Sequence, residues 1–390
     1  MQLVRYALAA GLARIADEMV GVSVVLLVLG RTGDPGLAGV TVAGYTLPAV
    51  LTGPLLGAWL GGARRPKLAL AANELVLAGV AAGLTAAVGR VPAVVVVALT
   101  VLAGASLPLT SAGFSSLLPP MVGAAGLPGA NTVDATTING AAIAGPAIAG
   151  TLAAAFGPGA AVGTIAVVAL LSVVATVALP AHRSTHRTRP PLLKVARDGL
   201  AHLARTPPLR AATLASMISY GCVGLLIVAL PAKVVQLGVP RAAAGYLWTA
   251  LEVGGLAGVL LLTPVLRRFR PEYVVFGAVA GYGAGLAVLA VAPTLAAAIG
   301  VAVVAGVAEG PCLPSVFVAR QRYSPGELLA QVATTGVSLK IGAFALGSVL
   351  SGALTGPLGP TGMILLAACG QLVAAVAGML TTSADPVRTP

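Results

Sequence analysis

Residues 13–30 read ARIADEMVGVSVVLLVLG, an apolar run that opens with an arginine, an aspartate and a glutamate. If a membrane helix began after Glu18, only about twelve apolar residues, or roughly 18 Å of helix, would precede the next arginine. A bilayer core is about 30 Å thick and needs about 20 mainly apolar residues. The helix must therefore begin near Leu3, so that Arg14, Asp17 and Glu18 lie inside the predicted span.

The composition supports a chain that lies mostly in a membrane. Of its 390 residues, 58% are hydrophobic and 9% are charged, whereas soluble domains carry about 25% charged residues. The N-terminus does not read as a cleavable signal peptide, because charge interrupts its apolar run and no cleavage pattern follows. The three cysteines lie in apolar runs and form neither a metal-ligand cluster nor a disulfide framework. We therefore predict an all-α integral membrane protein with no cofactor, no metal site and no catalytic residues.

Turn-forming residues divide the chain into twelve predicted transmembrane helices. The breaks contain glycine and proline, as in RTGDPG at 31–36 and TGPLGP at 355–360. We expect two pseudo-symmetric six-helix bundles at 1–181 and 211–390, joined by a cytoplasmic linker at 182–210. The predicted spans are 5–29, 36–62, 68–89, 92–118, 131–156, 159–180, 211–237, 242–266, 272–292, 294–319, 329–356 and 360–381.

Lysine and arginine are distributed unevenly between the two predicted faces. They fill the loops after spans 2, 6, 8 and 10, whereas the other face holds only Arg31, Arg90, Lys233 and Arg241. Positive loops mark the cytoplasmic face. Both termini are therefore predicted to be cytoplasmic, in the inner membrane of a bacterial cell. The net charge of +12 then reflects orientation and contact with anionic lipid headgroups, and it does not predict a nucleic-acid partner.

The charges of the first span have two interpretations. Charges inside a membrane are costly and usually face a bundle interior or a water-filled cavity. Arg14 lies three residues before Asp17 and four before Glu18, so these side chains can interact along one side of the helix, with Arg14 as charge partner. They form either a self-neutralised cluster that aids packing or a protonatable carboxylate that faces a transport path.

The two halves of the chain resemble each other at an offset of about 202–206 residues. Span 4 contains GASLP at 104–108, and span 10 contains GPCLP at 310–314. Span 5 carries GAAIAGPAIAG at 140–150, and span 11 carries GAFALGSVLSG at 342–352, each with a glycine at every fifth position. Parallel repeats of this kind are a transporter signature, with the substrate site near the middle of the membrane between the halves.

Over its whole length the chain resembles the major facilitator superfamily, on the basis of its spans, its central basic loop and its duplicated halves. GAAIAGPAIAG resembles the antiporter motif of that superfamily, formed here by Gly140, Gly145, Pro146 and Gly150, which implies export. SSLLPPMV, followed by GANTVDATTINGAAIAGP, and LLKVARDGLAHLARTPPLR after span 6 resemble the drug and siderophore exporter branch. The last of these stretches reads as an amphipathic helix, which we expect on the inner membrane surface.

The sequence departs from the superfamily pattern in two places. The loop after span 2 has Gly61 where the resemblance implies an aspartate, although the basic gate candidates Arg64, Arg65 and Lys67 are present. Span 4 contains no charged residue, whereas many proton antiporters of the superfamily have an arginine there. We therefore expect proton coupling to use carboxylates elsewhere in the chain.

Three further charged residues, Glu252, Glu309 and Lys340, lie near the middle of predicted spans. The resemblance implies that spans 1, 4, 7 and 10 line the cavity. That arrangement favours Asp17, Glu18 and Glu309 as proton-coupling residues, and Glu252 is a further candidate. Lys340 is a predicted charge partner. A purely structural bridge between Glu309 and Lys340 remains open, and so does a place for Glu252 at a helix interface.

Polar residues nearer the span ends have other predicted roles. Asn73 and Glu74 begin span 3 and Asp134 begins span 5, so they are predicted gate or cap residues. Asn139 and Gln371 lie deeper, where each can hydrogen-bond a substrate or another helix. Aromatic residues make up 4% of the chain, which predicts a mostly aliphatic pocket suited to an apolar or amphiphilic solute.

These features predict a monomeric secondary active transporter that handles a small molecule and protons within the lipid bilayer. Export by alternating access is the leading hypothesis, and import of a small metabolite is the alternative. A lipid-modifying enzyme would need clustered catalytic residues, yet the three histidines all fall in the basic loop region and read as solvated polar residues. A channel would not need a protonatable group in mid-span. No glycine-lysine phosphate-binding motif supports ATP coupling.

Overall fold

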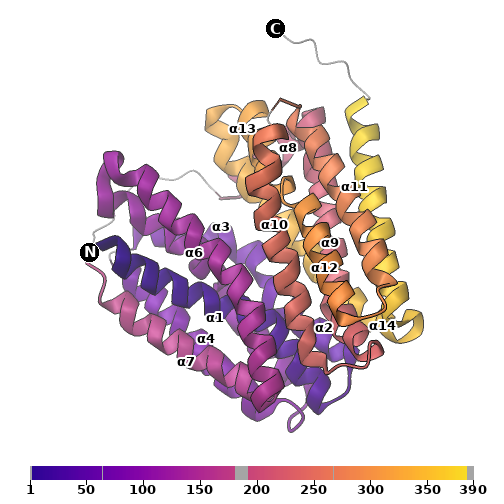
Figure 1. Ribbon diagram of the computed structural model, residues 1–390. Helices are drawn as coiled ribbons and strands as arrows, with labels where there is room; N and C mark the ends of the chain where they lie inside the picture. Colours follow the sequence, from indigo (N-terminus) through magenta and orange to yellow (C-terminus); the bar gives the residue numbers. More distant parts are fainter. Residues whose placement is uncertain (1, 64, 181–191, 267, 384–390) are drawn as a thin grey trace. The chain divides into compact units, whose positions relative to one another are not determined.

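Helices make up the regular structure throughout the described part of the chain. The computed structural model describes every residue except 1, 64, 181–191, 267 and 384–390 (Figure 1). The described residues form two compact units. Unit 1 takes its residues from Met1–Arg189 and Pro240–Thr249, and unit 2 takes its residues from Pro190–Val239 and Ala250–Pro390.

The helices of unit 1 lie where the first six spans are predicted. α1 packs against α6 and α7, and α4 packs against α7, so that α1, α4 and α7 lie side by side (Figure 1). A π-helical turn and a 3-10 turn join α5 to α6. The bounds are α1 Gln2–Arg31, α2 Pro35–Thr46, α3 Pro48–Gly62, α4 Pro66–Ala87, α5 Ala93–Pro108, α6 Leu118–Phe156 and α7 Pro158–Val177.

The helices of unit 2 pack around the long helix α14, which contacts α8, α9, α11 and α13. The first residues of α10 belong to unit 1, and the remainder of that helix belongs to unit 2. The bounds are α8 Leu192–Arg205, α9 Pro207–Gln236, α10 Ala244–Leu266, α11 Pro271–Ala290, α12 Leu295–Glu309, α13 Cys312–Tyr323 and α14 Gly326–Ser383.

The lengths of the helices suit a membrane. Among the described residues, nine helical segments are long and apolar enough to cross a bilayer. α1, with its charged residues, has 30 residues, which is also enough for a span. α14 holds two predicted spans, which are divided at Gly359 by a backbone φ of 67°. The predicted all-α fold is confirmed, and the number of twelve spans stays a prediction.

Proline explains why three predicted spans are interrupted helices. Proline has no N–H group to donate and its ring clashes with the preceding turn. Pro48 begins α3 directly after α2, within predicted span 2. Pro108 ends α5 and leads into the π-helical turn Leu109–Gly113, and Pro311 separates α12 from α13. Prolines thus mark three breaks within predicted spans, whereas Pro231 in α9 and Pro264 in α10 lie inside continuous helices.

The predicted duplication is visible at two glycines that each precede a proline. Gly157 has φ 87° and ψ 161° and separates α6 from α7. Gly359 has φ 67° and ψ 167° and divides α14. The two positions are 202 residues apart, which is the offset of the sequence repeat. Glycine takes this left-handed region without a Cβ penalty, so both halves make the same turn in the same way.

Close helix crossings repeat with the duplication as well. A Cβ atom added at Gly104 of α5 would lie 2.0 Å from the carbonyl oxygen of Tyr45 on α2. The equivalent atom at Gly310, after α12, would lie 2.3 Å from the carbonyl oxygen of Gly255 on α10. Only glycine permits backbones to approach this closely, which is the packing mode expected of helices in lipid.

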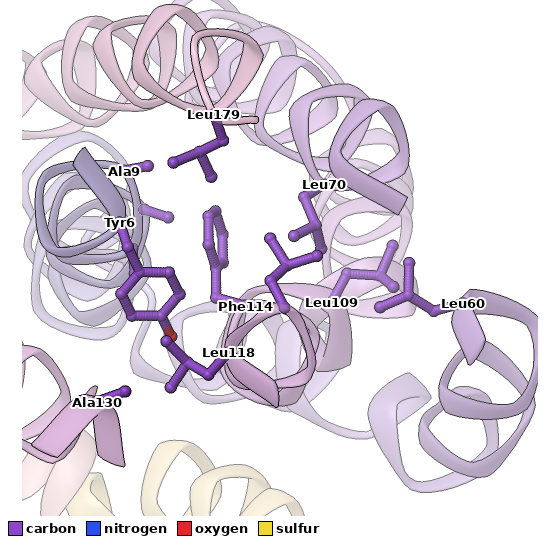
Figure 2. Packing of buried hydrophobic residues seen from close by; sticks show 12 residues of the cluster. Tyr6, Ala9, Leu60, Leu70, Leu109, Phe114, Leu118, Ala130 and Leu179 are labelled. Carbon is purple, nitrogen blue, oxygen red and sulfur yellow. The ribbon is translucent and has the colours of Figure 1, made fainter. Parts of the chain in front are cut away.

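One end of unit 1 contains an apolar core around Phe114. Its ring is fully buried, and Figure 2 shows it between Ala9 and Leu70, with Leu179 on another side. Tyr6 belongs to the same cluster and is also fully buried. This core fixes the π-helical turn and the start of α6 against α1 and α4, and so positions the polar residues that lie beside it.

The predicted amphipathic helix lies against protein. α8 packs on α9 and α14, and its Leu203 is buried with Leu209 and Val332. Gly199 approaches Gln331 so closely that an added Cβ atom would lie 2.9 Å from the carbonyl carbon of that residue. The face that carries Leu203 is thus covered by other helices of unit 2, and the expectation that this helix lies on the inner membrane surface stays a prediction.

Candidate functional site

A buried ion pair connects α1 to α6 in unit 1. The Nη1 atom of Arg14 lies 2.7 Å from Oδ1 of Asp134, and both residues are less than a tenth exposed. The Tyr6 hydroxyl donates to the same carboxylate oxygen at 2.5 Å, and the Ser115 hydroxyl donates to the other oxygen at 2.7 Å. Arg14 also donates to the hydroxyl of Thr137, one turn beyond Asp134. Asp134 therefore has a full set of donors, as a buried carboxylate requires.

This pairing adds to the expectations from the sequence. The predicted interaction of Arg14 with Asp17 along α1 is present, since the two lie within electrostatic range, but the ion pair of Arg14 is with a residue 120 positions away on α6. Asp134, a predicted gate or cap residue, is a buried acceptor of hydrogen bonds. An arginine side chain is long enough to reach a neighbouring helix, where a carboxylate can be desolvated together with it.

Asp17 and Glu74 form the second polar group of unit 1. The Tyr45 hydroxyl of α2 donates to Oδ1 of Asp17. Glu74 of α4 is fully buried, and its Oε1 accepts from Asn73 at 3.0 Å and from Thr110 at 3.1 Å. Glu74 also lies within electrostatic range of Asp17. The sequence predicts Asn73 and Glu74 at a gate, whereas the structure places both inside the bundle.

One oxygen of this acid pair is left without a donor. Among the described residues, the buried Oε2 atom of Glu74 has no hydrogen-bond partner. Asn73 instead ties the network together, since its side-chain nitrogen donates to Glu74 and, at 2.7 Å, to Thr110. An ionised carboxylate accepts hydrogen bonds at both oxygens. Here the two described donors reach only Oε1.

The four motif residues of α6 have different surroundings. A Cβ atom added at Gly145 would lie 2.6 Å from Cβ of Glu18, so α6 touches α1 there. One added at Gly150 would lie 2.7 Å from the carbonyl oxygen of Ala242, just before α10. Pro146 is buried, whereas Gly140 has open space around it. Two residues of the predicted motif, Gly145 and Gly150, therefore lie at close helix crossings, and Gly140 does not.

Glu18 is exposed in unit 1, whereas the residue before it, Asp17, is half-buried. The two candidates for proton coupling in α1 thus differ: Asp17 points toward Tyr45 and the acid pair, while Glu18 packs its Cβ atom beside Gly145. The Asp17 carboxylate accepts a hydrogen bond from Tyr45 of α2, and Glu18 lies within electrostatic range of the same tyrosine.

The basic loop residues after span 2 do not share one role. Lys67 donates from Nζ to the carbonyl oxygens of Val177 at 2.9 Å and Leu179 at 2.6 Å, so it ties the start of α4 to the end of α7. A cation is favourable at a helix C-terminus, where carbonyl oxygens lack partners. Arg65 is exposed. Arg64 lies outside the described residues.

Unit 2 brings Glu252, Glu309 and Lys340 together. Both carboxylates lie within electrostatic range of Lys340. Neither of the ion pairs described within 4 Å joins Glu309 to Lys340, so the predicted bridge between these two described residues does not form. The Lys340 ammonium instead lies 4.1 Å from the centre of the Tyr220 ring. Glu252 is exposed, and its place at a helix interface stays a prediction.

The two amide side chains that the sequence singles out, Asn139 and Gln371, each donate a hydrogen bond to a backbone carbonyl oxygen. Asn139 is exposed, and its side-chain nitrogen donates to the carbonyl oxygen of Ala135 in its own helix at 3.0 Å. Gln371 is fully buried and donates to the carbonyl oxygen of Ser219 on α9 at 3.1 Å. Gln371 therefore joins two helices of unit 2, while Asn139 has an accessible side chain.

Sequence reasoning missed the neutral residues of both networks in unit 1. Tyr6, Tyr45 and Thr110 supply hydroxyl donors to buried carboxylates. Their positions have no charge and no motif to mark them. A usable signal was present, because tyrosine is rare here, at seven residues of 390, and a tyrosine inside an apolar run needs a partner for its hydroxyl.

Long apolar helices, a duplicated pair of bundles and buried charges define a polytopic membrane transporter. The model of the Major Facilitator Superfamily matches residues 6–336. The chain belongs to the Major Facilitator Superfamily and is a multi-pass membrane protein.

Relatives agree with this assignment. The chain is 28% identical to an uncharacterized MFS-type transporter, y4rN, of Sinorhizobium fredii, over 98% of this chain and 95% of that protein. The solved nucleoside transporter NupG is similar in fold, with a TM-score of 0.79 at 13% identity, over 99% of this chain and 100% of that one. An auto-inhibited POT family peptide transporter has a TM-score of 0.74 at 12% identity, over 99% and 98%. At these identities the two structures show the fold.

Proposed function

We propose that this protein is a proton-coupled secondary transporter that exports a small amphiphilic compound, of drug, antibiotic or siderophore type, by alternating access. It acts as a monomer in the inner membrane of a bacterial cell, with both termini in the cytoplasm. The proposed cycle exchanges a proton on a buried carboxyl group for the substrate.

The observation that carries proton coupling is the acid pair Asp17 and Glu74. Both carboxyl groups lie in unit 1 within electrostatic range of each other, while Arg14 forms its ion pair with Asp134. Two negative charges that share a desolvated site are unfavourable, so binding of one proton relieves the repulsion between the two carboxylates. When water or a cationic group enters the site, that proton can leave. Asp17 and Glu74 are therefore the residues to which we assign the coupled proton.

Export is supported by the α6 motif. The resemblance to an antiporter motif rests on Gly140, Gly145, Pro146 and Gly150, and two of these glycines lie at close crossings with α1 and with the start of α10. Crossings of this kind leave no gap for a solute between α6 and its neighbours. The same backbone contact also lets two helices move against each other without side chains in the way.

The function is tested by accumulation of a panel of dyes and antibiotics in an efflux-deficient bacterium. Wild type is compared with Asp17→Asn and Glu309→Gln at equal membrane abundance, with and without an uncoupler of the proton gradient. Lower accumulation with wild type, abolished by the uncoupler and by Asp17→Asn, supports proton-driven export. Higher accumulation in cells that express wild type than in cells without the protein would instead support import of a small metabolite. Export that survives both substitutions would remove these carboxylates from coupling.

A further inference from the structure

The Lys340 ammonium of unit 2 lies on the face of an aromatic ring. Its Nζ atom is 4.1 Å from the centre of the Tyr220 ring. The Phe344 ring, one turn further along α14, lies 5.2 Å from the Tyr220 ring at an interplanar angle of 37°. A cation within about 6 Å of a ring centre is attracted by the electrons of the ring face. The two rings thus form an aromatic wall that already holds a positive charge.

Two carboxylates from other helices lie near this ammonium. Glu252 comes from α10 and Glu309 is the last residue of α12, and each lies within electrostatic range of Lys340. Glu309 reaches toward α10, since an added Cβ atom at Gly255 would lie 4.0 Å from its Oε2. Glu252 is exposed, whereas Glu309 and Lys340 are half-buried. The group is therefore not sealed inside the packed core of unit 2.

The charges of this group do not balance. When all three residues are ionised, two negative charges face one positive charge. Lys340 forms no ion pair within 4 Å among the described residues, so it neutralises neither acid by direct contact. In a partly desolvated site an excess negative charge attracts one further monovalent cation. The Tyr220 ring face that Lys340 now covers already holds a cation, so it can hold another in its place.

We propose that Tyr220, Phe344, Glu252 and Glu309 form a binding site for an organic monocation and that Lys340 is its built-in competitor. The cationic group of the ligand takes the place of the Lys340 ammonium over the Tyr220 ring, and the displaced ammonium moves toward the carboxylates. The apolar part of the ligand lies on the Phe344 ring. This inference rests on the proposed function, because it names the substrate class of that transporter as amphiphilic organic cations.

The test is equilibrium binding of tetraphenylphosphonium to the purified full-length protein. Tetraphenylborate is the matched probe, since it has the same shape and the opposite charge. We expect wild type to bind the cation and to bind the anion at least about tenfold more weakly. Equal binding of the two probes, or no binding of the cation, would overturn the proposal.

Substitutions then locate the binding. Lys340→Met is expected to bind the cation at least about fivefold more tightly, because the competitor is removed. Tyr220→Leu and Glu309→Gln are expected to bind it at least about fivefold more weakly, and Tyr220→Phe should resemble wild type. Asp198→Asn on α8 is the matched control, since it removes an acid of unit 2 outside the site. Weaker binding by Lys340→Met, or unchanged binding by both Tyr220→Leu and Glu309→Gln, would contradict the assignment.

The binding experiment is separable from the transport experiment. It needs neither a membrane gradient nor turnover. If the cation binds as described but no solute is transported in membranes, the proposed function fails and the site stands. If the protein exports neutral or anionic compounds and fails to bind the cation, the site fails and the proposed function stands.

Discussion

Arg14 and Asp134 form a buried ion pair of 2.7 Å between α1 and α6, at the point where Tyr6 and Ser115 also donate to the same carboxylate. The pair fastens two helices that are predicted to be separate spans of one bundle. It also occupies the arginine, which leaves Asp17, three residues later in α1, to hydrogen-bond with Tyr45. We therefore propose a structural role for the ion pair and a functional role for the acid pair Asp17 and Glu74.

Removing one partner of this pair is expected to destabilise the protein by about 3–5 kcal/mol, because the other charge stays buried without compensation. Arg14→Met and Asp134→Asn each remove one partner. The double variant Arg14→Met/Asp134→Leu should recover much of the loss. Thermal unfolding of the detergent-purified protein measures the effect, and the exposed Arg90→Ala is the control. Equal stability of wild type and both single variants would show that the pair contributes nothing.

Two tyrosine hydroxyls distinguish the structural network from the functional one. Tyr6→Phe removes a donor to Asp134 and is expected to lower stability by about 1–2 kcal/mol while transport per folded molecule is kept. Tyr45→Phe removes the donor to Asp17 and is expected to reduce proton-driven transport several-fold with a smaller change in stability. Both quantities are measured on the same preparations. The reverse pattern would exchange the roles of the two networks.

The glycine motif offers a matched pair of substitutions in a single helix. Gly145→Ala places a methyl group 2.6 Å from the Glu18 side chain and is expected to cost about 1–3 kcal/mol by overpacking. Gly140→Ala meets open space and is expected to be neutral or to stabilise the helix by about 0.5–1 kcal/mol. Melting temperature and the yield of folded protein report the difference. Identical behaviour of the two variants would refute the close crossing at Gly145.

Lys67 is predicted to hold the start of α4 to the end of α7. Lys67→Met removes two hydrogen bonds from an ammonium to carbonyl oxygens and is expected to cost about 1.5 kcal/mol. Arg65→Met, two residues earlier and exposed, is the control and should change stability by less than about 0.5 kcal/mol. Thermal unfolding compares the two. If Arg65→Met proved the more harmful, the assignment of the anchoring role to Lys67 would be wrong.

The spans and their breaks could be predicted from the sequence because their signals are local. Glycine and proline act on their own turn of backbone, so RTGDPG at 31–36 and TGPLGP at 355–360 predict interruptions that the structure contains. The repeat adds a second local signal. Gly157 and Gly359 adopt the same turn because each is a glycine before a proline at the same place in its half.

The partners of the buried charges could not be predicted, because they depend on which helices are neighbours. The spacing of Arg14 and Glu18 indicates contact along α1, but nothing in that spacing encodes an aspartate 120 residues away. The depth of Glu74 was missed for the same reason: its position eight residues into α4 fits both a gate and a buried site until the neighbouring helices are placed. The Lys340 ammonium lies over the Tyr220 ring. The positions of charged residues in the sequence do not predict such a contact.

The most direct test of the account is transport into proteoliposomes that contain the purified protein, with and without an imposed pH gradient, for wild type, Asp17→Asn and Glu74→Gln. A substrate found in the cellular assay is the probe. The account predicts that wild type concentrates it against its gradient, whereas both variants lose this accumulation and still exchange labelled for unlabelled substrate. Accumulation by both variants at the wild-type level would contradict the assignment of the coupled proton to this acid pair.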